Sequence, residues 1–113
     1  MSGAVRKAYD APFPDDTYCV APRAMPGLVP TSPEDPAAAA NRSAWAALCA
    51  SPTPMLVAFS DGDPITGATA PIFQREMEGA RGIDHPVVRD AGHFLQEDAG
   101  EELAEHIVDF LRG

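Results

Sequence analysis

One histidine of the sequence is placed where a reactive imidazole is expected. His93 follows a glycine in "DAGHFLQED", at the expected end of a strand, and Asp61 and Asp63 follow an earlier expected strand in "SDGDP". A carboxylate that is hydrogen-bonded to one imidazole nitrogen fixes the tautomer and leaves the other nitrogen free to take a proton. The spacing therefore predicts that Asp63 and His93 form an acid–base pair. It is equally compatible with a solvated loop histidine and a simple turn.

Two apolar runs predict the strands that would bring these loops together. "PMLVAFS", residues 54–60, is bounded by a proline and by the turn former "DGDP", which is typical of a strand buried on both faces. "HPVVRDAG", residues 85–92, predicts a second strand, and residues 69–82 predict a helix between the two that glycine ends. Catalytic residues in open parallel sheets gather at the carboxyl ends of the strands. Both loops are therefore expected at one edge of the sheet.

Helix signals flank this unit on both sides. Asp35 is a candidate cap for a helix over about 36–49, which Ser51-Pro52 stops. Asp98, with Glu101 three residues later, resembles a capping box for a final helix with apolar residues along one face. From residue 54 onward the order predicts a right-handed βαβα unit with two parallel strands. Seven prolines from Pro12 to Pro36 predict loop with short helical turns in the first third.

Composition narrows the class of protein. The chain has 113 residues, enough for one small domain, and a net charge of −9, which repels nucleic acid and anionic membrane surfaces. No apolar run reaches membrane-spanning length, and the N-terminus lacks the apolar core of a signal peptide. Cys19 and Cys49 fit no metal spacing and are too few for a disulfide framework. We expect a cytoplasmic protein that binds neither nucleic acid nor membrane.

Other reactive constellations are weaker. Asp61 with Asp63, or Asp90 with His93, suggests a metal only distantly, because such groups on solvent-facing loops are ordinarily solvated. We therefore expect neither metal nor cofactor. Ser60 lacks the leading glycine that a nucleophile elbow requires. Trp45, on the expected 36–49 helix, is most simply explained by core packing.

Several motifs together resemble one enzyme family. "AFSDGDPIT" followed by "DAGHFLQEDAGEELAEHIVDFL" resembles the C-terminal end of the haloalkane dehalogenases, which belong to the α/β-hydrolase superfamily. "YDAPFPDDTY" and "RAMPGLVPTSPEDPAAAANRSAW" resemble the end of that family's cap region and the return into its main domain. The resemblance implies that residues 1–30 are the end of the helical cap and its return loop. It implies that residues 31–113 are the C-terminal βαβα portion of an α/β-hydrolase domain.

The resemblance also implies roles for five residues. His93 matches the family's catalytic histidine and Asp63 matches its acid partner, while Pro26, Val29 and Ile65 match positions that line the substrate pocket. In that family an aspartate nucleophile displaces halide from a small haloalkane and forms an alkyl ester, which the histidine hydrolyses by activating water.

The sequence differs from that family in the nucleophile, for which it has no motif. Neither a G-x-D-W-G nor a G-x-S-x-G segment occurs in the 113 residues. We therefore expect the C-terminal part of a dehalogenase-like hydrolase that is truncated and inactive alone. The alternatives are a part of an epoxide or ester hydrolase, and a non-catalytic interaction module. An exposed sheet edge would also favour self-association.

Overall fold

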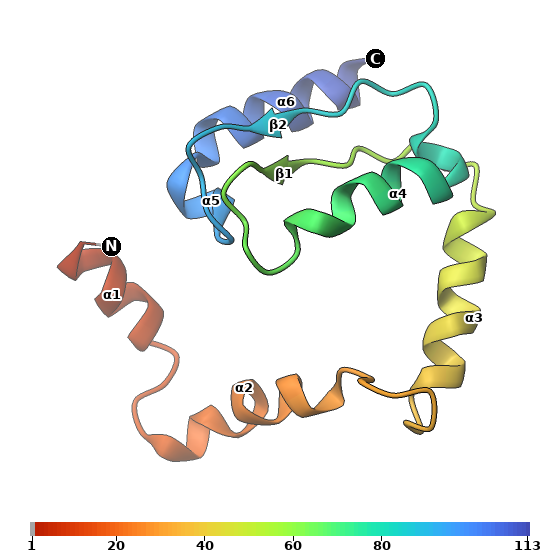
Figure 1. Ribbon diagram of the computed structural model, residues 1–113. Coiled ribbons are helices and arrows are strands. Elements are labelled where there is room, and N and C mark those ends of the chain that lie inside the picture. Colours follow the sequence, from red (N-terminus) through yellow and green to blue (C-terminus); the bar gives the residue numbers. More distant parts are fainter. Residues whose placement is uncertain (1) are drawn as a thin grey trace. The chain divides into compact units, whose positions relative to one another are not determined.

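The computed structural model describes residues 2–113, and the chain divides into two compact units after Ser43. Residues 2–43 form helices and turns joined by short irregular segments, as the prolines predict (Figure 1). α1 opens with the Ser2 hydroxyl as its cap, and the sequence analysis did not predict this helix. The elements of this unit are α1 (Gly3–Asp10), α2 (Val20–Ala24) and two 3-10 turns (Asp16–Cys19 and Met25–Leu28), followed by the start of α3 (Ala38–Cys49).

The start of α3 is organised by Asp35, as predicted. Its carboxylate accepts a hydrogen bond from the backbone N–H of Ala37 at 2.9 Å, and its carbonyl accepts one from Ala38. The helix begins two residues later than predicted and ends at Cys49, before Pro52.

The second unit contains a small parallel sheet, so the prediction of mixed helix and strand with parallel pairing is confirmed (Figure 1). Phe59 lies opposite Val87 and Ser60 lies opposite Val88. The predicted strand lengths were wrong, because β1 (Phe59–Ser60) and β2 (Val87–Val88) have two residues each.

The strands are short because the preceding residues find other hydrogen-bond partners. The Val57 N–H donates to Nδ1 of His85 at 3.3 Å, and the Met55 N–H donates to the Gly79 carbonyl at 2.8 Å. Pro86 has no N–H to continue a ladder. Met55 and Val57 are therefore bound to a turn and to a side chain, in a segment where the apolar pattern predicted a strand.

The helix predicted over 69–82 is interrupted. A 3-10 turn at Gly67–Thr69 leads into α4 (Ala70–Glu76), Met77 adopts an extended backbone, and a further 3-10 turn covers Glu78–Ala80. The break lies at Met77, and the turn that follows brings Gly79 against another segment, where a Cβ would lie 1.8 Å from the Thr53 carbonyl oxygen.

The final helix is also divided, and the predicted capping box was wrong. α5 (Leu95–Asp98) and α6 (Gly100–Arg112) are separated by Ala99, and no side chain caps α6. The Asp98 carboxylate instead accepts a hydrogen bond from the Gly92 N–H.

The core of the second unit is small. Met77 is fully buried, and with Val57 and Ala80 it forms a cluster against which Trp45 packs. The Trp45 ring meets Phe73 edge-on at 5.4 Å between centroids, so the prediction that this tryptophan serves core packing is confirmed. No helix within residues 2–113 is long and apolar enough to cross a membrane.

Candidate active site

The loops that follow β1 and β2 are joined by backbone hydrogen bonds. The Asp61 N–H donates to the Val88 carbonyl at 3.1 Å, and the Gly62 N–H donates to the Ala91 carbonyl at 3.0 Å. Because the two strands are parallel, their carboxyl ends meet at one edge of the sheet. The short sheet therefore brings the loop of Asp63 against the loop of His93.

Asp63 and His93 contact each other directly. Nδ1 of His93 lies 3.0 Å from Oδ1 of Asp63, across thirty residues of sequence. The Asp63 side chain is only 5% exposed, whereas that of His93 is 34% exposed. The carboxylate is thus held inside the loop, and the imidazole it contacts remains open to solvent.

The carboxylate of Asp63 is held ionised by its own turn. Its Oδ1 accepts hydrogen bonds from the backbone N–H groups of Ile65 at 2.8 Å and Thr66 at 3.1 Å, and its Oδ2 accepts one from the Thr66 hydroxyl. The hydroxyl of Thr66 contributes most to lowering the pKa of Asp63 well below its ordinary value of 3.8, against the opposing effect of burial. The bond to His93 lowers this pKa further.

This geometry determines which imidazole nitrogen can accept a proton. An ionised carboxylate only accepts hydrogen bonds, so Nδ1 of His93 is the donor to Asp63. The lone pair of the neutral ring then lies on Nε2. A buried carboxylate behind Nδ1 also stabilises the imidazolium formed when Nε2 takes a proton. The pair has the geometry of a general base with its orienting acid.

Asp61 takes no part in this pair. It is an exposed residue, and its carboxylate lies 3.7 Å from a guanidinium nitrogen of Arg89. Within residues 2–113 no group of three or more histidine, cysteine, aspartate or glutamate side chains is arranged to hold a metal ion.

The residues predicted to line a substrate pocket lie in different units. Pro26 and Val29 belong to the first unit, at and directly after its second 3-10 turn, and Ile65 belongs to the Asp63 loop of the second. All three are exposed. Their role in a pocket stays a prediction.

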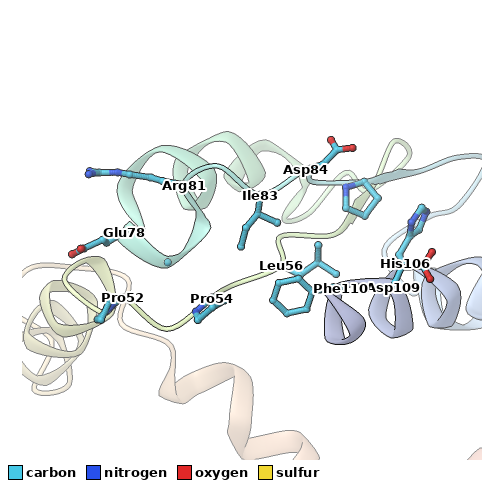
Figure 2. A pocket seen from close by; sticks show the side chains of 13 residues that line it. Pro52, Pro54, Leu56, Glu78, Arg81, Ile83, Asp84, His106, Asp109 and Phe110 are labelled. Atoms are coloured by element: carbon cyan, nitrogen blue, oxygen red, sulfur yellow. The ribbon is translucent and has the colours of Figure 1, made fainter.

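A groove lies at the opposite end of the second unit (Figure 2). Figure 2 shows Leu56, Ile83 and Phe110 facing this space, which has a volume of about 790 Å³. These residues precede the two strands or lie at the end of α6, so the groove is separate from the Asp63–His93 pair.

The role of Thr66 at the Asp63 carboxylate was not predicted from the sequence. Its hydroxyl and backbone N–H both serve the Asp63 carboxylate. The signal was present in "DPIT", because aspartate and threonine side chains characteristically hydrogen-bond within tight turns.

Comparison with known proteins shows which proteins this chain resembles. No protein-family model matches the chain. A haloalkane dehalogenase of Mycolicibacterium paratuberculosis is 50% identical over 111 residues, which cover 97% of this chain and 36% of that protein. A haloalkane dehalogenase of Psychrobacter cryohalolentis is 44% identical over 111 residues, 98% of this chain and 37% of that protein. Haloalkane dehalogenase 1 of Mycobacterium tuberculosis is 49% identical over 110 residues, 97% of this chain and 36% of that protein.

The similarity covers nearly the whole chain but only part of each relative. The chain spans little more than a third of the length of these curated relatives and corresponds to their C-terminal part.

Proposed function

The chain belongs to the haloalkane dehalogenase family, and on that premise we propose that it supplies the acid and the base of the catalytic triad of a dehalogenase-like α/β-hydrolase. His93 is the general base and Asp63 is its acid partner. Residues 31–113 form the C-terminal part of the hydrolase domain, with the βαβα order from residue 54 onward, and residues 1–30 form the end of the cap and its return loop.

The observation that carries this proposal is the hydrogen bond between Asp63 and His93. In the complete reaction an aspartate nucleophile displaces halide from a haloalkane carbon and becomes an alkyl ester. Nε2 of His93 takes a proton from water, and the hydroxide attacks the ester carbonyl. The bond between the carbonyl carbon and the alkoxide oxygen then breaks, which regenerates the aspartate carboxyl group. The proton on Nε2 passes to the alkoxide to give the alcohol. Asp63 stabilises the imidazolium between these two transfers.

The substrate is a small haloalkane, and Pro26, Val29 and Ile65 contribute to the pocket that holds it. The nucleophile does not come from residues 1–113, because no nucleophile-elbow motif occurs there. Residues 1–113 alone are therefore inactive, since a base without an ester has nothing to hydrolyse.

The test is an enzyme in which residues 1–113 replace the matching part of the Mycolicibacterium paratuberculosis relative, here called the joined enzyme. We expect it to release bromide from 1-bromobutane, and we expect residues 1–113 alone to release none. In the joined enzyme, His93→Ala should stop turnover after one halide per molecule and leave an ester one butyl group heavier. Mass spectrometry of the intact protein detects this ester.

Each contrary outcome identifies a different function. A correctly folded joined enzyme that releases no bromide but hydrolyses epoxides or esters would place the chain in another branch of the superfamily. Turnover that persists in His93→Ala would show that this imidazole is not the base. Binding of a protein partner by a folded joined enzyme that shows none of these activities would favour a non-catalytic module.

A further inference from the structure

Side chains bind both the backbone N–H and the backbone carbonyl of Gly92, the residue before His93. The Gly92 N–H donates to Oδ2 of Asp98 at 2.9 Å, and the Gly92 carbonyl accepts from the Ser60 hydroxyl at 2.7 Å. Ser60 ends β1, and Asp98 ends α5. Gly92 is therefore fixed from two elements, one on each side of it in the sequence.

The position of Gly92 makes this arrangement relevant to the imidazole. Its carbonyl belongs to the peptide bond that leads into His93, so fixing this peptide fixes where the His93 side chain starts. A Cβ at Gly92 would lie 3.3 Å from Oδ2 of Asp98, so the glycine lets the carboxylate approach the backbone closely. Ser60 is 7% exposed, so its hydroxyl is an internal contact and not a solvated one.

Asp98 does not cap the helix that follows it. An aspartate directly before a helix usually caps that helix by accepting from its first N–H groups. α6 begins immediately after Asp98 and Ala99, yet no side chain caps it. The Asp98 side chain reaches back six residues to the His93 loop instead.

We propose that Asp98 and Ser60 are positioning residues that hold the Gly92 backbone, through its N–H and its carbonyl respectively, so that Nδ1 of His93 points at Asp63. This inference rests on the proposed function for its catalytic consequence only. The orientation of the ring is a property of the loop, so it can be measured whether or not the reaction is a dehalogenation.

The first experiment measures the ring directly. In the joined enzyme labelled with ¹⁵N-histidine, the chemical shifts of the two ring nitrogens of His93 give its tautomer. We expect the unaltered protein to carry its proton on Nδ1, because that nitrogen donates to Asp63. Asp98→Ala should shift the neutral ring toward the Nε2–H tautomer, and Ser60→Ala should shift it in the same direction.

Two further variants separate positioning from helix stability. Asp98→Asn keeps an oxygen that accepts from Gly92 but loses the charge, so positioning predicts that the Nδ1–H tautomer is restored. If Asp98 acts instead through its charge at the start of α6, Asp98→Asn should lose the Nδ1–H tautomer as fully as Asp98→Ala does. Glu101→Ala is the matched control, because it removes a first-turn charge of α6 from an exposed residue and should leave the tautomer unchanged.

The second experiment measures the consequence in the joined enzyme. A misplaced His93 slows only ester hydrolysis, so Asp98→Ala should keep the first release of halide while slowing steady turnover by roughly tenfold to a hundredfold. General destabilisation would reduce both phases together.

The outcomes separate the two proposals. An unchanged tautomer and unchanged ester hydrolysis in both Asp98→Ala and Ser60→Ala would overturn the positioning role. A shifted tautomer in a joined enzyme that does not release halide would support positioning and contradict the proposed function.

Discussion

Gly62 lies so close to Ala91 that no side chain fits between the two loops of the site. A Cβ at Gly62 would be 2.6 Å from the Ala91 carbonyl oxygen, which already accepts a hydrogen bond from the Gly62 N–H. The contact lies between backbones, so neither side can yield by changing a rotamer. The Asp63 loop therefore depends on this glycine for its distance from the His93 loop.

Gly62→Ala should consequently push the two loops apart. We expect a loss of about 1–3 kcal/mol in unfolding free energy, as in other overpacked sites, together with loss of the Nδ1–H tautomer of His93. Urea unfolding of the joined enzyme and the ring ¹⁵N shifts measure the two effects. Gly100→Ala is the control, since nothing lies within 4 Å of a Cβ there and the residue is helical. Equal stability of the two variants would contradict the close approach.

Thr66→Val should raise the pKa of Asp63 toward its ordinary value, because the Thr66 hydroxyl is the main cause of the lowering. A lowered carboxyl pKa stabilises the folded state fully above the ordinary value of 3.8 and loses that effect as the pH falls through the folded value. The variant should therefore be less stable at about pH 7, and the difference should shrink by about pH 3. Urea unfolding of the joined enzyme at both pH values tests this. The exposed Thr31→Val is the control, and a difference that grows on acidification would contradict the assignment.

His85→Phe should destabilise the second unit. Nδ1 of His85 accepts from the Val57 N–H, and Nε2 lies 3.0 Å from the Ala80 carbonyl to which it donates. A phenyl ring leaves both backbone groups without their partner, at about 1–3 kcal/mol for each buried group. His106→Gln is the control, because Nε2 of that histidine lies 3.7 Å from Oε1 of Glu102, beyond hydrogen-bonding distance. Similar urea midpoints for the two variants of the joined enzyme would show that His85 is dispensable.

Residues 1–113 alone should be marginally stable. Within residues 2–113 the sheet has only two strands, so β1 has an unpaired edge, and apolar side chains such as Val87 and Ile72 are exposed. We expect the isolated chain to bind a hydrophobic dye, to self-associate and to show no sharp thermal transition as a monomer. A monomer that melts cooperatively above about 50 °C would contradict this and favour an independently stable small domain.

The sequence alone was enough to predict that Asp63 and His93 lie together, in the loops that follow two parallel strands. A buried apolar run followed by "DGDP" and a second run followed by "AGH" predicted parallel strands whose following loops meet, and Asp63 does lie against His93. The roles of Asp35 at the start of α3 and of Trp45 in the core were also predicted from neighbouring residues in the sequence. Hydrophobic patterning and turn chemistry depend on neighbouring residues, which is why they are readable from one sequence.

Tertiary structure decided where each backbone donor and each polar side chain found its partner. The Val57 N–H donates to the His85 ring and not to a neighbouring strand, and the Asp98 side chain accepts from Gly92 and does not cap α6. These partners lie twenty-eight and six residues away, and periodicity carries no information about such contacts. A polar group binds whichever partner the folded chain brings within about 3 Å, so its partner follows from the packing of the whole unit.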